Sequence, residues 1–254
     1  MKPLVIGVDA RELLGDTTGV GRYLGELMRR WTARADASTR HFVLYAPEPL
    51  AVPFTGQTTT VRVLPGGRGT WWEQTQLAAA VRRDRPDVFF APAYTAPAWL
   101  PRPFAVTIHD VSFSRHPEWF RFREGTRRRL LTRRAARRAD VVFTVSRFSR
   151  DEIHALYGVP KERILVVPNG VTHQRSARPQ TRETLVLYTG SIFNRRRLPD
   201  LVAAFARTVR TVPDARLTIV GDNRTFPYQD IAAAATSHGV SSRVTLVQYL
   251  SGEP

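Results

Sequence analysis

Short runs of β-branched and aromatic residues alternate with longer stretches of helical periodicity along the whole chain. That alternation predicts parallel sheets whose strands are joined by crossover helices. Several runs are apolar at consecutive positions, as strands covered on both faces must be. The strands predicted in the first part of the chain are Leu4–Val8, His41–Tyr45, Thr60–Leu64, Asp87–Ala91, Phe104–His109, Val141–Val145 and Ile164–Val167. The helices predicted between them are Val20–Arg34, Trp71–Arg83, Glu118–Arg138 and Arg150–Leu156.

The alternation is interrupted after Val167 and then restarts. Pro168-Asn169-Gly170 has turn chemistry, and the polar stretch 173–182 has no periodicity, so we expect a linker there. The later strands are predicted at Leu185–Tyr188, Arg216–Val220 and Val244–Val247, and the later helices at Leu198–Thr211 and Tyr228–Ser237. The predicted fold is α/β, with a Rossmann-like doubly wound domain at 1–172, a linker at 173–182 and a second Rossmann-like domain at 183–254.

The second predicted domain is incomplete. Three parallel strands without further neighbours leave a sheet edge and one sheet face uncovered, so we expect this domain not to be stable by itself. The sequence ends at Ser251-Gly252-Glu253-Pro254, which resembles the unfinished start of a helix.

Composition indicates an ordinary globular protein with an unusual charge. Hydrophobic residues make up 43% and charged residues 24% of the chain, and cysteine is absent, so no disulfide or thiolate metal site can form. No apolar run approaches the roughly 20 residues of a membrane span, and we expect a cytoplasmic protein. The net charge of +16 comes almost entirely from arginine. Codon composition can produce such a bias; otherwise a basic surface favours nucleotide diphosphates, lipid phosphates, an acidic membrane face or nucleic acid.

A glycine-rich loop follows the first predicted strand and opens a helix. Gly15, Gly19 and Gly21 would let the backbone approach a ligand, and the helix N-terminus favours a phosphate or another anion. The spacing is not the Gly-x-Gly-x-x-Gly fingerprint of dinucleotide binding. The alternative is a flexible connection in which Thr18 caps the helix.

Two further positions lie at predicted strand ends in the first domain. His109 and Asp110 follow one strand, where the imidazole could orient a hydroxyl or accept a proton, or could simply pack under a loop. After the next strand, Ser149 with Glu152 has the pattern of a capping box. No Gly-x-Ser-x-Gly elbow supports a serine nucleophile.

Nine arginines lie in the helical stretch Arg121–Arg138. A solvated helix face is the usual explanation, and contact with an acidic membrane surface is the alternative. Nucleic acid ranks lower, because the aromatic residues expected of a single-strand groove are missing.

The second domain begins with a strand, a glycine turn and the three arginines Arg195, Arg196 and Arg197. Three adjacent guanidinium groups at a helix start repel one another unless a negative group lies between them. A diphosphate is the natural candidate, and simple surface charge is the alternative.

Several segments stand in an order that matches a known family. They are Gly19-Val20-Gly21-Arg22-Tyr23, Thr107-Ile108-His109-Asp110, Ala139–Ser149, Tyr157–Ile164, Val167–Val171 and Tyr188–Ala204. With these segments, which span nearly the whole chain, the sequence resembles the retaining glycosyltransferases of family 4, whose GT-B fold has two Rossmann-like domains.

The resemblance implies transfer of a hexose from a nucleotide diphosphate sugar, such as GDP-mannose or UDP-glucose, with the anomeric configuration retained. The acceptor would be a glycan, a lipid-linked intermediate or a small molecule, and a mannosyltransferase of cell-envelope polysaccharide biosynthesis is one such enzyme. Acceptors would bind mainly to the first domain and donors to the second. No cofactor and no metal would be needed beyond the nucleotide sugar as co-substrate, and no Asp-x-Asp pair is present for a cation. Peripheral contact with an acidic membrane at the inner face is an open alternative, and no nucleic-acid partner is expected.

Carried over by position, the resemblance assigns roles to particular residues. His109 and Asp110 would be the catalytic residues at the reacting sugar, and Arg196, in the place of the family's lysine, would neutralise the leaving diphosphate. The residues implied in substrate binding are Gly19, Gly21, Arg22 and Ser146. The residues implied around the diphosphate besides Arg196 are Gly190, Asn194, Arg195 and Gly221.

Two departures from the family pattern stand out. Ser191 occupies a position where the family often has arginine, so Arg195 or Arg197 would take over part of that role. The family's pair of glutamates seven residues apart would lie beyond Pro254, and we therefore expect the 254-residue chain, as a C-terminally truncated member, to transfer sugar inefficiently by itself.

Two other classes of protein compete with this interpretation. A non-catalytic module would bind an acceptor or a partner protein without releasing a diphosphate. A Rossmann oxidoreductase or epimerase is disfavoured, because the dinucleotide fingerprint and an acidic ribose ligand after the second strand are both missing.

Overall fold

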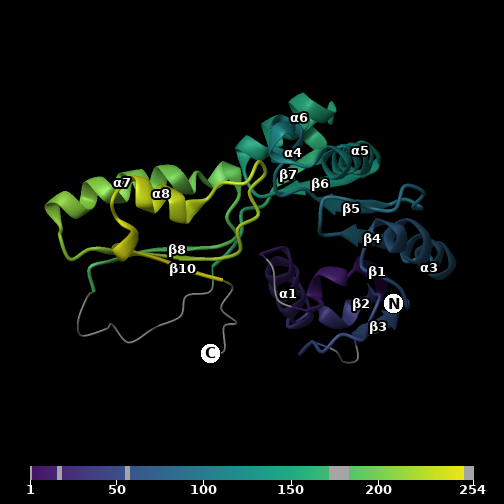
Figure 1. The fold of residues 1–254 in the computed structure, drawn as a ribbon. Coiled ribbons are helices and arrows are strands. Elements are labelled where there is room, and N and C mark those ends of the chain that lie inside the picture. The colour runs from purple at the N-terminus through teal and green to yellow at the C-terminus, as the bar shows by residue number, and fades with distance from the viewer. Residues whose placement is uncertain (1, 16–18, 55–57, 172–182, 249–254) are drawn as a thin grey trace. The chain divides into compact units, whose positions relative to one another are not determined.

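The computed structural model describes residues 2–15, 19–54, 58–171 and 183–248, and the chain divides into two compact units (Figure 1). Unit 1 comprises Met1–Arg115 and Thr126–Val171, and unit 2 comprises His116–Gly125 and Thr172–Pro254. The predicted linker 173–182, the predicted cap Thr18 and the last residues Ser251–Pro254 lie outside the described residues.

The sheet of unit 1 has seven parallel strands in the order β3-β2-β1-β4-β5-β6-β7. They are β1 Leu4–Asp9, β2 Arg40–Ala46, β3 Thr59–Val63, β4 Val88–Ala91, β5 Phe104–Thr107, β6 Val141–Thr144 and β7 Ile164–Val166. The order reverses between β1 and β4, which is the topological switch point of a doubly wound sheet, where ligands bind beside the carboxyl ends of the strands.

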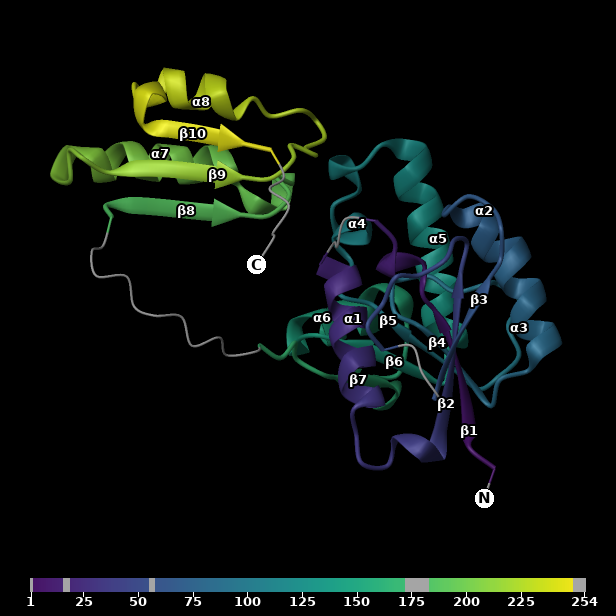
Figure 2. The same ribbon diagram turned by 90° about the horizontal axis from the view of Figure 1, so that it is seen from below.

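Helices cover both faces of this sheet (Figure 2). They are α1 Gly19–Thr32, α2 Thr70–Trp72, the π-helix η3 Glu73–Leu77, α3 Ala78–Asp84, α4 Ser112–Arg115, α5 Phe122–Arg138 and α6 Arg147–Tyr157. The short 3-10 turns of the chain are Arg11–Leu13, Ala37–Thr39, Pro117–Trp119, Lys161–Arg163, Asn194–Arg196 and Ser241–Arg243.

Alternation along the strands divides the core of unit 1 in two. Phe89 joins a cluster with side chains of α2, α3, α5 and α6, whereas its neighbour Phe90 joins a second cluster with Leu24 and Met28 of α1. Successive side chains of a strand point to opposite faces of the sheet. A strand in which two consecutive side chains are both buried therefore lies between two helical layers. This arrangement explains the apolar runs in the sequence.

Unit 2 contains a three-stranded parallel sheet in the order β10-β9-β8, with two helices. The elements are β8 Leu185–Thr189, β9 Arg216–Val220, β10 Val244–Val247, α7 Leu198–Thr211 and α8 Ile231–Ser237. Leu217 and Ile219 pack against Val202 and Phe205 of α7. On the other face of β8, Leu185 and Leu187 are exposed. The second sheet is thus small, and the predicted α/β class with two Rossmann-like parallel sheets is confirmed.

Three predicted helix starts are wrong by three or four residues. The helix predicted from Tyr228 begins at Ile231, where Asp230 caps it by accepting the Ala233 amide at 2.9 Å. The helix predicted from Glu118 begins at Phe122, because Pro117–Trp119 forms a separate turn in which the rings of His116 and Trp119 stack 4.0 Å apart. The helix predicted from Arg150 begins at Arg147, and it is capped by Ser146, whose Oγ accepts the Ser149 amide at 3.0 Å. The capping box expected at Ser149 is therefore not formed.

Candidate functional site

His109 lies just beyond the carboxyl end of β5, close to the switch point of the unit 1 sheet. Its Nε2 is 3.1 Å from the carbonyl oxygen of Pro92. Because a carbonyl only accepts, Nε2 carries the hydrogen, and the neutral ring presents Nδ1 as an acceptor. Burial lowers the pKa of His109, against the opposing effects of the Pro92 carbonyl and the Asp110 charge. The ring is therefore neutral at physiological pH.

Two tyrosines pack against the imidazole ring. Tyr23 of α1 meets it edge-on, with ring centroids 4.9 Å apart, and Tyr94 of the β4–β5 loop meets it at 5.5 Å. The hydroxyl of Tyr23 is 3.2 Å from Thr107 Oγ1 at the end of β5. Sequence reasoning gave neither tyrosine a role. Tyr94 has a left-handed backbone conformation, with a φ of 63°, and no sequence pattern indicates that conformation.

Asp110 serves as an anchor in this geometry. Its Oδ2 accepts the hydroxyl of Tyr94 at 3.1 Å, and its Oδ1 accepts the amide of Ser112 at 2.9 Å. A carboxylate that accepts two hydrogen bonds is held in one orientation. Asp110 thereby fixes Tyr94 against the His109 ring.

The predicted glycine loop reaches the same edge of the sheet. Gly19 begins α1, Gly21 is buried in its first turn, and Arg22 is exposed. A Cβ added at Gly19 would meet no atom within 4 Å, so packing within the described residues does not require glycine there. Tyr23, one turn along, joins this helix start to His109. The N-terminus of α1 and the imidazole are therefore linked through Tyr23, and the free amides of a helix N-terminus favour an anion.

Ser146 is engaged within the protein. Its hydroxyl caps α6 and donates to Ser149 Oγ at 3.0 Å, and Ser149 Oγ donates to the carbonyl oxygen of His109 at 3.1 Å. This chain of hydroxyls orders the backbone at His109. The role that the structure shows for Ser146 is thus in capping and in support of His109.

A buried ion cluster, which the sequence analysis missed, ties the end of β1 and the following turn to the π-helix η3 and the β4–β5 loop. Arg11 contacts Asp9 at 3.0 Å and Glu73 at 2.5 Å, and all three side chains are buried. Thr95, next to Tyr94, donates to the same Glu73 oxygen at 2.7 Å. Burial raises the pKa of Asp9 to about 6, although the Arg11 guanidinium acts in the opposite direction. An acid directly after a buried strand, followed by arginine two residues on, is the only local signal for the cluster.

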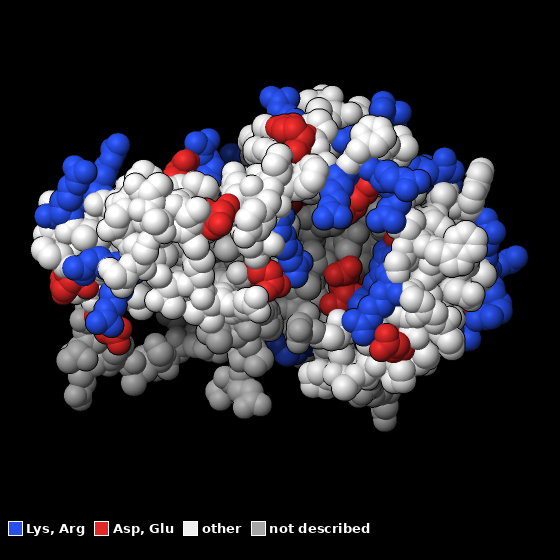
Figure 3. All heavy atoms as spheres, in the orientation of Figure 1, with Lys and Arg blue, Asp and Glu red and all other residues white. Residues whose placement is uncertain are grey.

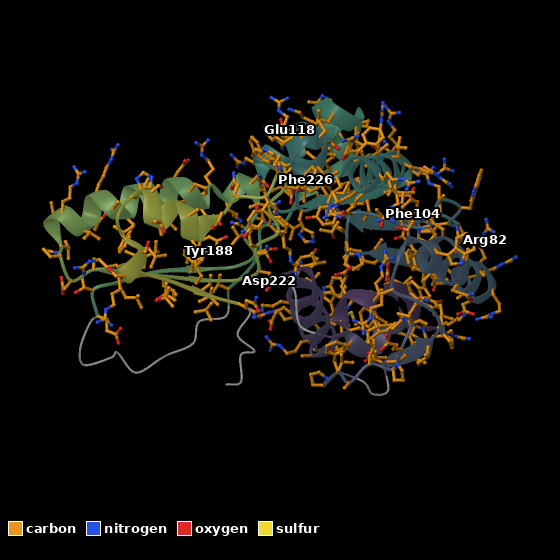
Figure 4. The ribbon with its side chains drawn as sticks, in the orientation of Figure 1. Arg82, Phe104, Glu118, Tyr188, Asp222 and Phe226 are labelled. Carbon is orange, nitrogen blue, oxygen red and sulfur yellow. The ribbon has the colours of Figure 1, made fainter. Side chains whose placement is uncertain are left out.

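In unit 2, Gly190 and Gly221 follow β8 and β9 at the carboxyl edge of the small sheet. Their φ values are 131° and 146°, and a Cβ added at Gly221 would collide with the carbonyl group of Gly190. Close approach of the two backbones therefore requires glycine at 221, independently of any ligand. Tyr188 and the loop bearing Asp222 and Phe226 are marked in Figure 4.

Asn194 also has a role within the protein. Its Oδ1 accepts the amide of Phe226 at 2.7 Å, and its Nδ2 donates to the carbonyl oxygen of Pro227 at 3.3 Å. The side chain therefore fastens the loop after β9 to the arginine-bearing turn.

The three adjacent arginines have separate surroundings. Arg197, with a φ of 52°, forms an ion pair with Asp200, and the guanidinium of Arg195 lies 4.4 Å from the centroid of the Phe193 ring. Arg196 is exposed, and no ion pair to its guanidinium is found among the residues that the structure describes. The expected mutual repulsion is thus relieved in part by the protein itself, which leaves Arg196 as the guanidinium most open to an anion.

The described ranges contain no cluster of three His, Cys, Asp or Glu side chains that could hold a metal. No helix in the same ranges combines the length and the apolar character that a bilayer span requires.

Comparison with known proteins identifies the family. Residues 17–175 match the model of Glycosyltransferase Family 4, so the chain belongs to that family. Glycogen synthase of Mycobacterium tuberculosis is 30% identical over 149 residues, which are 54% of this chain and 36% of that protein. The chain thus spans little more than a third of this curated relative.

Two solved structures show the GT-B fold of the chain. WaaG, a glycosyltransferase involved in lipopolysaccharide biosynthesis, matches with a TM-score of 0.66 and 15% identity, over 97% of this chain and 70% of its own. Anabaena HepE, solved with UDP-glucose, matches with a TM-score of 0.65 and 17% identity, over 97% of this chain and 69% of its own. The family and fold predicted from the sequence are confirmed, whereas the roles assigned to single residues stay predictions.

The buried carboxyl of Asp9 should make folding stability depend on pH. Below its unfolded pKa of 3.8, Asp9 is protonated in both the folded and the unfolded state, and its contribution to the free energy of unfolding is complete. That contribution is lost as the pH rises through the folded pKa of about 6. At roughly 1.4 kcal/mol per pKa unit, the loss is on the order of 3 kcal/mol. Urea unfolding between about pH 4 and pH 7 measures it. Asp9→Asn should flatten the profile and exposed Glu162→Gln should not; parallel profiles for Asp9→Asn and wild type would contradict the assignment.

Gly221→Ala should disrupt the unit 2 sheet, because the new Cβ has to displace the Gly190 carbonyl. Gly239→Ala is the matched control, since Gly239 also has a positive φ, of 69°, but has open space around its Cα. The control should cost about 1 kcal/mol and Gly221→Ala several times more. Amide hydrogen exchange in β8 and β9 reports the difference. Equal protection in the two variants would show that the sheet does not need glycine at 221.

Proposed function

We propose that this protein transfers a hexose from a nucleotide diphosphate sugar to an acceptor, with retention of configuration. The observation that carries the proposal is the site of unit 1, where Tyr23 joins the N-terminus of α1 to a neutral His109 close to the switch point of the sheet. Membership of Glycosyltransferase Family 4 over residues 17–175, which include this site, supports the same reaction.

In this proposal His109 binds the transferring sugar. Its Nδ1 accepts a hydrogen bond from a sugar hydroxyl, while Pro92, Tyr94 and Asp110 keep the ring in one tautomer and orientation. A preorganised acceptor stabilises the transition state without having to reorganise during the reaction. Gly19 and Gly21 allow a substrate to approach the amides of α1, and Arg22 supplies an exposed positive charge there.

Arg196 holds the leaving diphosphate, with Arg195 beside it in the turn Asn194–Arg196 and Gly190 directly after β8. Guanidinium groups bind phosphate oxygens through charge-assisted, frequently bidentate hydrogen bonds. Such groups can stabilise a departing diphosphate without a metal ion. We therefore propose that neither a metal nor another cofactor takes part.

The substrates are proposed by class. The HepE complex with UDP-glucose supports a UDP-sugar donor, and GDP-mannose is the alternative. The WaaG likeness is one of fold, and it is compatible with a role in cell-envelope polysaccharide synthesis and with a lipid-linked acceptor. We further propose a cytoplasmic protein in peripheral contact with an acidic membrane.

Arg196→Ala should weaken UDP binding about tenfold or more, because a charge-assisted phosphate contact contributes roughly 1.5–3 kcal/mol. Arg196→Lys should recover part of the loss, since the charge returns without the planar fork. Isothermal titration with UDP measures both, with Arg210→Ala in the last turn of α7 as the control. If Arg196→Ala binds UDP as tightly as the control, Arg196 is not a diphosphate ligand.

His109→Ala should lower the rate of nucleoside diphosphate release from UDP-glucose or GDP-mannose at least about tenfold, with UDP affinity unchanged. His41→Ala, at the amino end of β2, is the control, and release should persist in EDTA. A His109→Ala protein that turns over donor at the wild-type rate would refute the role of the imidazole. A wild-type protein that binds UDP and acceptors but never releases diphosphate would instead be the non-catalytic module.

A further inference from the structure

The loop between β4 and β5 carries an exposed tryptophan on which three arginines converge. Arg82 of α3 donates to the carbonyl oxygen of Trp99 at 3.1 Å. Arg134 and Arg138 of α5 both donate to the carbonyl oxygen of the preceding residue, Ala98. The backbone of the loop is thereby tied to two helices, while the indole of Trp99 stays 66% exposed.

The same arginines lie over the indole. The guanidinium of Arg134 is 5.0 Å and that of Arg138 5.8 Å from the centroid of the Trp99 ring. Within residues 2–15, 19–54, 58–171 and 183–248, neither forms an ion pair with a carboxylate, and nor does Arg82. Nearby Arg102, by contrast, is paired with Asp140 at 2.9 Å. Two guanidinium groups over the ring and a third bonded to the Trp99 backbone therefore have no carboxylate partner in the described part of the chain.

Two more exposed apolar side chains lie on helical segments that hydrogen-bond this loop. Trp71 is 80% exposed one helical turn before Gln74, whose side chain bonds both Ala96 and Ala98 of the loop. Leu130 is 63% exposed on α5, one turn before Arg134. We call Trp71, Arg82, Trp99, Leu130, Arg134 and Arg138 the Trp99 surface. Arginines are prominent on this side of unit 1 in Figure 3, and Figure 4 labels Arg82 where it points outward.

We propose that the Trp99 surface docks unit 1 onto a bilayer rich in anionic phospholipids. Tryptophan prefers the boundary between headgroups and acyl chains, and arginines beside it reach the phosphates while their stems cover apolar surface. Each basic group near an anionic bilayer contributes about 1 kcal/mol. The surface therefore supplies both of the attractions that peripheral attachment needs.

A single-stranded nucleic acid fits this surface less well. Sequence-tolerant binding of a strand uses open aromatic faces on which successive bases stack. The guanidinium groups of Arg134 and Arg138 already lie over the Trp99 ring, and the three apolar residues project from three separate elements.

The Trp99 surface is not the arginine-rich helix face that the sequence of Arg121–Arg138 indicates for membrane contact. Arg128 packs over the rings of Tyr94 and Phe113, at 4.6 and 4.8 Å, and Arg137 donates to the carbonyl oxygen of Tyr157. These two arginines make contacts within unit 1. The Trp99 surface instead combines the second half of α5 with α2, α3 and the β4–β5 loop.

Sedimentation of the whole protein with vesicles of phosphatidylcholine, with and without phosphatidylglycerol, tests the proposal. The protein should bind only the anionic vesicles, and added salt should weaken the binding. Arg134→Gln and Arg82→Gln should each lower the partition coefficient about fivefold, the factor that 1 kcal/mol gives. Trp99→Ala should lower it at least as much.

Two controls match these variants. Arg133→Gln removes the same charge from the adjacent position on α5, and Phe148→Ala removes an exposed aromatic ring from α6; both should bind vesicles as the wild type does. Arg82→Gln, which removes one surface hydrogen bond, keeps the test valid if Trp99→Ala lowers the helical circular dichroism.

Three results would overturn the proposal: no binding to anionic vesicles, equal losses in Arg134→Gln and Arg133→Gln, or tighter binding to an oligonucleotide than to vesicles that depends on Trp99. The docking does not rest on the sugar-transfer reaction. Unchanged UDP affinity in the Trp99 and Arg82 variants would separate a failure of one proposal from a failure of the other.

Discussion

A guanidinium buried between two carboxylates is the interaction on which the edge of unit 1 depends. Arg11 neutralises Asp9 at the end of β1 and Glu73 at the start of the π-helix, and removal of the arginine would leave two buried acids without a counter-charge. Glu73 in turn holds Thr95, whose neighbour Tyr94 packs against His109 and binds Asp110. The position of the imidazole is therefore set by pairs of residues that lie far apart in the sequence.

This dependence explains what the sequence could and could not predict. Strand positions followed from hydrophobic runs, and His109 and Gly19 could be expected at one sheet edge because carboxyl ends of parallel strands converge there. The partners of those residues could not, since Arg11 and Glu73 are separated by 62 positions and neither has a local pattern that names the other. The start of α6 was predicted wrongly for a related reason. Ser146 caps this helix while Ser149 bonds the carbonyl oxygen of His109, a residue 40 positions away in the sequence.

The arginines of this protein have several different physical roles. Arg11 is an interior counter-ion, Arg128 covers aromatic rings, Arg197 is paired with Asp200, and Arg196 stays open to solvent. A count of charges treats these as equal, although their surroundings differ in burial and in neutralisation. The functional proposals rest on the arginines that no carboxylate of the described residues neutralises.

The π-helix of Glu73–Leu77 gives chain length itself a role in this fold. A π turn holds one residue more than the regular helix around it. Loss of a single residue there would restore α-helical winding and rotate everything before it by about 100°, which swings the Glu73 carboxylate out of line with Arg11. The number of residues in this helix is therefore fixed. Deletion of one residue that makes no contact with the ion cluster would still separate Glu73 from Arg11.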